Sequence, residues 1–148
     1  MSSEFREGTA LWQTPIRDLG LRIEGSALEP VLAAFRAELI ERGLGRIAPR
    51  FYLSTEWGVP EDTISIAIPF YLARPELTAR HAEQVGHVEG ATQADLLRYL
   101  RHEMGHVVNY AYELYLEPAW ERVFGEFETD YHEAVSYTHL TLPTSDLV

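Results

Sequence analysis

Two histidines stand four residues apart in the pentapeptide HEMGH near the middle of the chain, with a glutamate directly after the first. Four residues of an α-helix turn through about 400°, so His102 and His106 project from the same face, one turn apart. Both imidazoles can then reach one ion at about 2.0 to 2.1 Å, the zinc–nitrogen distance in proteins. Glu103, turned by about 100° from His102, stands beside such an ion rather than on it. The spacing predicts a metal held by His102 and His106, with Glu103 placed as a base.

The chemistry of this arrangement is peptide hydrolysis. A zinc ion (Zn2+) held by two such histidines acidifies a bound water, and the neighbouring carboxylate takes the proton and later passes it to the leaving amine. His-Glu-x-x-His on a helix is a signature of metallopeptidases. The prediction is a zinc enzyme with Glu103 as catalytic residue and a peptide or protein as substrate. The competing interpretation is a helix whose two histidines only pack.

The pentapeptide must lie on a helix for this chemistry to work. Thr92 and Asp95 have the spacing of a capping box, and apolar residues recur at helical spacing after them: Leu96, Leu97, Leu100, Met104, Val107, Val108 and Ala111. Gly105 costs about 1 kcal/mol relative to alanine inside a helix, which predicts close approach of backbone or substrate. Polar side chains that could orient the ligands extend along the same side, at Asp95, Tyr99, Asn109 and Glu113.

Five further elements are predicted around this helix. The segment 26–43 has a capping box at Ser26 and Glu29, apolar residues at helical spacing and Gly43 as a stop, so it is a helix. RFYLSTEW (50–57) and DTISIAIPFYLA (62–73) are typical of strands, with Pro69 indicating a strand end or a sheet edge. The edge near residues 64–68 is predicted to bind an extended peptide. Short helices are expected over 75–86 and 118–124.

Composition narrows the class of protein. The chain has 148 residues, 12 basic against 23 acidic, and a formal charge of −11. This charge disfavours nucleic acid and anionic membrane surfaces as partners. With no cysteine, thiolate metal sites and disulfides are excluded, so a metal must be held by imidazole and carboxylate. No leader-like or membrane-spanning stretch is visible, and we expect a cytoplasmic protein.

A zinc site needs a third protein ligand, which the spacing does not supply. VVNYAY follows His106, so the metzincin extension is absent. Glu113 shares the face but lies about 10.5 Å along the helix from His106. His81 and His87 lack any spacing signal, and surface or capping roles are expected for them, as core roles are for Tyr110 and Tyr112. The candidates that follow are Glu126, which with Asp130 is similar to thermolysin-like spacing, and then Glu128, His132 and Glu133.

A larger resemblance surrounds the pentapeptide. PFYLA, VEG, RHEMGH, NYAY and W-x-x-VFG-x-F, within residues 50–131, resemble bacterial proteins described as zinc-binding metallopeptidases of gluzincin-like type. The resemblance implies an α+β, zincin-like fold, with a small mostly antiparallel sheet packed on helices that include the HExxH helix. It also implies a glutamate ligand well downstream of FG-x-F. We therefore expect the chain to be a truncated, N-terminal portion of a longer peptidase.

The last fourteen residues differ from the rest of the chain. VSYTHLTLPTSDLV contains neither arginine nor glutamate, and it resembles the translated adapter sequence found at the ends of proteins from fragmentary assemblies. The expected organisation is one domain over residues 1–134, incomplete at its C-terminus, and a non-native tail over 135–148. The alternative to an enzyme is a noncatalytic peptide- or partner-binding module of degenerate zincin fold.

Overall fold

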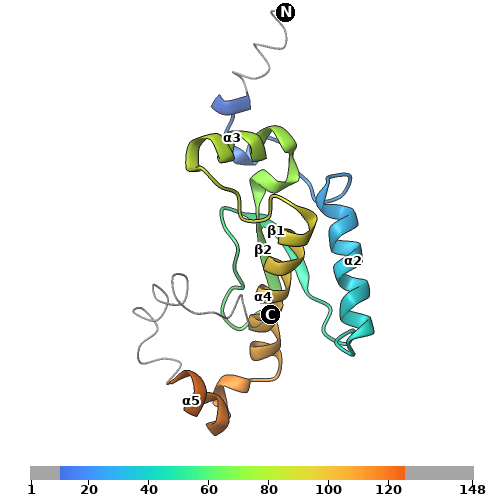
Figure 1. The fold of residues 1–148 in the computed structure, drawn as a ribbon, viewed down its shortest axis with the longest axis vertical. Coiled ribbons are helices and arrows are strands. Elements are labelled where there is room, and N and C mark those ends of the chain that lie inside the picture. Colours follow the sequence, from blue (N-terminus) through green and yellow to red (C-terminus); the bar gives the residue numbers. More distant parts are fainter. Residues whose placement is uncertain (1–10, 126–148) are drawn as a thin grey trace, which may run out of the picture.

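The computed structural model describes residues 11–125, which form helices around a two-stranded sheet (Figure 1). The α-helices are α2 (Leu28–Glu41), α3 (Pro75–Val85), α4 (Gln93–Ala111) and α5 (Pro118–Phe124). The strands are β1 (Arg50–Ser54) and β2 (Ser65–Pro69), and short 3-10 turns lie at η1 (Ile16–Asp18), η2 (Phe70–Ala73) and η3 (Leu114–Leu116). The chain is therefore mixed helix and strand, as expected at the level of the α+β class.

Helix α2 is confirmed, but the predicted capping box at Ser26 and Glu29 is wrong, because the helix begins one residue later, with Ala27 at the N-cap and no side-chain cap hydrogen bond. Ser26 Oγ accepts from the N–H of Leu28 at 3.2 Å, and the Glu29 carboxylate reaches back to the N–H of Gly25 rather than to that of Ser26. At the other end Gly43 has φ +78°, and the next N–H, of Leu44, donates to Leu39 O at 2.7 Å. Glycine adopts this left-handed conformation without a Cβ penalty, so the helix ends there.

The two strands form where the sequence predicts them, but they run parallel, so the expected antiparallel sheet is wrong. The pairing places Arg50 opposite Ser65 and Ser54 opposite Pro69. The connection 55–64 carries the chain back to the starting end of the sheet, and on the way Gly58 makes an antiparallel bridge to Ala67. Apolar patterns predict a strand but carry no information on its direction, which here depends on this connection. Pro69 ends β2, as the sequence indicates.

The remaining helices match their predicted positions. Pro75 occupies the first turn of α3, and Gly86 ends it at φ +91°. Thr92 caps α4, its Oγ1 accepting from the N–H of Asp95 at 3.1 Å. The Asp95 carboxylate accepts in turn from Gly90 N–H at 2.8 Å, which holds the preceding loop against the start of the helix. None of the helices within 11–125 has the length and apolar content needed to cross a membrane.

The hydrophobic core lies where α2, α4 and β2 meet. Its completely buried side chains include Phe35 from α2, Ile66 and Ile68 from β2, and Val107 from α4. α2 also packs on β1 through the edge-to-face pair of Phe35 and Phe51, with ring centroids 6.3 Å apart. Figure 1 shows α3 near one end of the long axis of the molecule and α5 at the other, with α4 between them. The HEMGH helix is thus the central element.

Candidate metal centre

His102 and His106 lie side by side on α4. Their ring centroids are 5.2 Å apart, the rings are inclined at 76°, and both side chains are half-buried. Two imidazoles that hold one ion at about 2.1 Å in tetrahedral geometry have ring centres about 5 Å apart. The histidine pair therefore fits two ligand positions of a zinc ion, and these two residues would hold it.

Glu103 is buried, with 6% of its surface exposed. Among residues 11–125 it is the one charged residue that is buried. Burial, and after it the negative charge of Glu89, raise the pKa of its carboxyl to about 7. A carboxyl with a pKa near neutrality can both accept and release a proton at physiological pH. The position beside the histidine pair and the raised pKa are both properties of a general base.

No third ligand completes the pair within residues 11–125, where no three metal-ligating side chains come together. Glu113 follows the end of α4 and is exposed, with φ +53°. His81 stacks on the Tyr71 ring with centroids 3.9 Å apart, and His87 is exposed in the loop after α3. The downstream candidates lie outside the described residues: Glu126, Glu128, Asp130, His132 and Glu133.

One flank of the histidine face is held by Trp57. Its indole stacks on Tyr99, one turn before the histidine pair, with centroids 5.4 Å apart and planes 13° apart. The indole N–H donates to the carbonyl of Glu89 at 2.9 Å, which ties the loop before α4 to the 55–64 connection. Burial and the nearby Glu89 charge raise the pKa of Tyr99. The sequence did not reveal this contact, because nothing in its local pattern links Trp57 to Tyr99.

The opposite flank is held by an ion pair between α4 and α2. Arg101 donates to both carboxylate oxygens of Glu38, with Nη2–Oε1 at 2.8 Å and Nε–Oε2 at 3.1 Å. This hydrogen bonding lowers the pKa of Glu38 and raises the pKa of Arg101. Arg42 approaches the same carboxylate at 3.8 Å. The pair joins residues 63 positions apart, so no local spacing could predict it.

The face between these flanks is open at Gly105. A Cβ built at this glycine meets no atom within 4 Å among the described residues, so no close backbone approach accounts for it. Next along the face, Asn109 has a buried Oδ1 that no donor of the described chain reaches.

The two tyrosines predicted as core differ: Tyr110 is half-buried and packs edge-on against Tyr115, whereas Tyr112 is 56% exposed, so its core assignment is wrong. Tyr112 follows the last turn of α4, beyond the reach of the core.

The predicted peptide-binding edge on β2 is already occupied. Ala67 exchanges two hydrogen bonds with Gly58, at 2.7 and 3.3 Å, and Ser65 N–H donates to Thr63 Oγ1 at 3.3 Å. Pro69 has no N–H, so this edge of β2 has no donor left among the described residues. In an antiparallel pair, the residues on either side of a doubly bonded residue direct their backbone N–H and C=O groups away from the partner strand. The outer edge therefore lies at Trp57 and Val59, beside α4.

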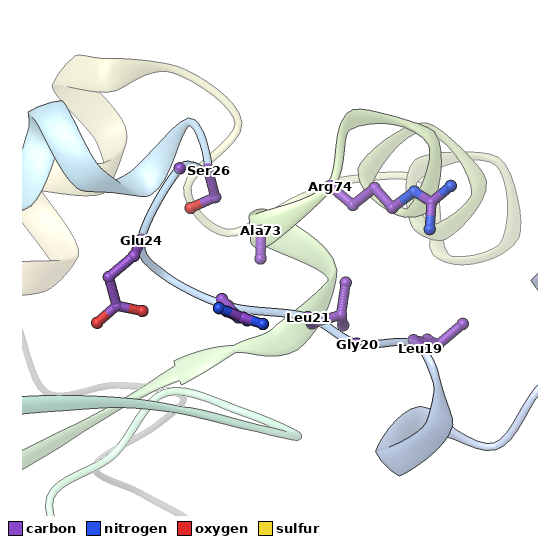
Figure 2. Close-up of a pocket in the computed structure, with 9 residues that line it drawn as sticks. Leu19, Gly20, Leu21, Glu24, Ser26, Ala73 and Arg74 are labelled. Atoms are coloured by element: carbon purple, nitrogen blue, oxygen red, sulfur yellow. The ribbon is translucent and has the colours of Figure 1, made fainter.

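A hollow in the described chain is lined by none of the residues of α4. It has a volume of about 380 Å³ and lies between the segment 19–26 and the Ala73–Arg74 stretch (Figure 2). Its lining includes Arg74 and Glu24, and Arg74 already pairs with Glu76 at 3.4 Å. The metal-site prediction therefore depends on the chemistry of the histidine pair rather than on a cavity.

Comparison of the chain with protein-family models, with curated proteins and with solved structures gave no match in any of the three.

Proposed function

We propose that this chain carries the zinc-binding and proton-transferring part of a metallopeptidase with a zincin-type fold. The observation that supports the proposal is the pairing of two imidazoles at the separation for one ion with a buried carboxyl of near-neutral pKa next to them on the helix. Each feature has an ordinary structural explanation on its own. Their coincidence in one turn of a capped helix favours catalysis.

His102, His106 and Glu103 have separate roles in the proposed hydrolysis. Zinc, when bound, supplies a Lewis acid that polarises a water and the scissile carbonyl. His102 and His106 hold the ion through neutral imidazole nitrogens. Glu103 would accept the proton of the attacking water and deliver it to the leaving amine.

The substrate's backbone is proposed to pair with the outer edge at Trp57 and Val59. These residues flank Gly58, whose own backbone is used by Ala67, so their N–H and C=O groups point away from β2. Trp57 also stacks on Tyr99 and so lies next to the histidine turn. An extended peptide added here would run beside Glu103 and the metal. The proposed peptide-binding edge is thus the 55–64 connection, one segment outward from the edge of β2 that the sequence predicts.

Two histidines alone hold zinc weakly, so a third ligand is needed for turnover. We propose that it is a carboxylate outside the described residues, and expect weak metal binding and little hydrolysis from the 148-residue chain. Strong hydrolysis that is abolished by Glu126→Gln would overturn the expected low activity and identify Glu126 as that carboxylate.

The first test is zinc binding to the purified chain, measured by calorimetric titration. We expect near one zinc per chain, loss of binding in His102→Ala and His106→Ala, and unchanged binding in the control His87→Ala, because His87 is exposed and away from the pair. Glu103→Ala is expected to keep zinc and to lose whatever turnover of a peptide library the chain has. Zinc binding that survives both histidine substitutions would overturn the proposal.

A noncatalytic peptide-binding module is the second candidate, favoured by the lack of a third ligand within residues 11–125. It predicts peptide binding that neither zinc nor Glu103→Ala alters. Peptide affinity with and without zinc, measured by fluorescence polarisation, separates the two functions.

A further inference from the structure

The rotation of α4 about its own axis decides where the histidines point. Successive residues of a helix are about 100° apart, so Arg101 and Glu103 lie on opposite sides of His102. Tyr99 lies about 60° from His102 on the Glu103 side by the same count. The Arg101–Glu38 ion pair and the Tyr99–Trp57 ring stacking thus connect α4 to other elements on the two sides of the histidine face.

The apolar side of α4 restrains this rotation less sharply. Leu100, Met104 and Val107 are buried and hold the apolar side of α4 in the core, but the hydrophobic effect is non-directional. A guanidinium that binds both oxygens of a carboxylate is planar and directional, and therefore fixes orientation as well as distance. The Arg98–Asp95 pair at 2.8 Å, by contrast, stays within the helix and cannot fix it against a neighbour.

We propose that the Arg101–Glu38 pair is a positioning device that sets the rotation of α4, and thereby aims the His102–His106 pair at a common ion. Arg101 touches neither metal nor substrate in this scheme. It acts through the backbone of the adjacent His102. The proposal rests on the metal binding proposed above, and deepens it by naming what keeps the two imidazoles in ligating geometry.

The geometry and the charge of Arg101 predict opposite effects on metal affinity, which makes the proposal testable. A positive charge near a cation weakens binding, so electrostatics alone would make Arg101→Gln bind zinc more tightly. Loss of positioning would make it bind more weakly. Arg101→Lys keeps the charge but loses the planar fork, so it isolates the geometric contribution.

The experiment is zinc titration of the full chain and its variants by calorimetry, with folding checked by circular dichroism. We expect both Arg101→Lys and Arg101→Gln to weaken zinc binding about fivefold to tenfold, at the lower end of what supporting residues of metal sites contribute. The matched control is Arg98→Lys on the same helix, expected to change affinity less than twofold, since its partner Asp95 is intrahelical. The exchanged pair, Glu38→Arg with Arg101→Glu, is expected to recover most of the lost affinity.

A second measurement separates failure of this inference from failure of the proposed function. In the metal-free chain, the nuclear Overhauser contact between the His102 and His106 rings reports their mutual orientation, given centroids 5.2 Å apart. We expect Arg101→Lys to weaken it and Arg98→Lys to leave it intact. A wild-type chain that binds no zinc refutes the proposed function alone. A folded Arg101→Lys chain with unchanged ring contact, or an Arg101→Gln chain with tighter zinc binding, refutes the positioning role.

Discussion

The part of α4 that carries His102 and His106 and the stretch that follows it are neighbours in the chain and are supported very differently. Around the histidines, Leu100 and Val107 are 1% and 0% exposed, and both flanks of the helix are tied to other elements. After α4, Leu116 and Val123 are 66% and 73% exposed, and α5 packs mainly on η3. Figure 1 shows α5 lying apart from the sheet and α2.

This difference indicates where the rigidity of the proposed site comes from. Order around His102, Glu103 and His106 is supplied by elements that precede them in the chain: α2, β2 and the 55–64 connection. The segment η3–α5 contacts α4 beyond the histidine turn, through the Tyr110–Tyr115 ring pair. The described residues therefore prearrange the two proposed ligands and the proposed base. The following experiments test this contrast.

The largest expected effect is on stability, from core truncation on α2. Phe35 is 0% exposed, so Phe35→Ala should lower the free energy of unfolding by about 3 to 5 kcal/mol. Phe124→Ala, on α5 and 51% exposed, should lower it by less than about 1 kcal/mol. Urea unfolding measures both. Equal losses would show that α5 belongs to the same cooperative unit as the core, and would remove the contrast.

The second-largest expected effect is a dependence of the free energy of unfolding on pH, caused by Glu103. Its pKa is about 7 in the fold against an ordinary 4.5, so between these values the folded chain holds a proton that the unfolded chain has lost. The metal-free protein should therefore lose stability as pH rises from 4.5 to 7, by up to about 3 kcal/mol from this group. Glu103→Gln should remove this slope and be the more stable chain at pH 8. Parallel urea-midpoint curves for the two proteins would contradict the buried-base assignment.

Capping of α4 is expected to have an intermediate effect. Thr92→Ala removes the acceptor for Asp95 N–H and should cost about 1 kcal/mol of stability. Hydrogen exchange should quicken at the first turn of α4 more than at the histidine turn, which its flanking contacts hold. Thr55→Ala, an exposed change in the 55–64 connection, serves as control. Uniform loss of protection along α4 would show that the flanking contacts do not act independently of the cap.

The smallest expected effect is an increase in stability, from substitution of Gly105. Gly105 is inside α4 with free space around its Cα, so Gly105→Ala should stabilise the fold by about 0.5 to 1 kcal/mol. Zinc affinity should stay the same, while peptide binding should weaken under the proposed function if a substrate approaches the histidines across the open face at Gly105. Thermal unfolding and peptide titration of the same variant check both parts. A destabilised variant would mean that another part of the chain packs on this face.

The sequence predicted the elements well because their signals are local. Thr92 with Asp95, and Gly43 and Gly125 as stops, act within a few residues, and the helices begin and end close to them. Strand direction was not predictable, since it depends on how 55–64 crosses the sheet. The flanking contacts of α4 were also invisible, because Glu38 and Trp57 are brought to the helix only by the tertiary fold.

The same sequence separations have a kinetic consequence. An α-helix of this length can form within about a microsecond from local contacts, whereas contacts between distant segments form only after long loops have closed. The Arg101–Glu38 pair closes 63 residues, and the Trp57–Glu89 hydrogen bond closes 32. During refolding, helical signal should thus precede the fixed orientation of the two imidazoles. The chain is expected to gain its affinity for metal only in the final, slowest phase of folding.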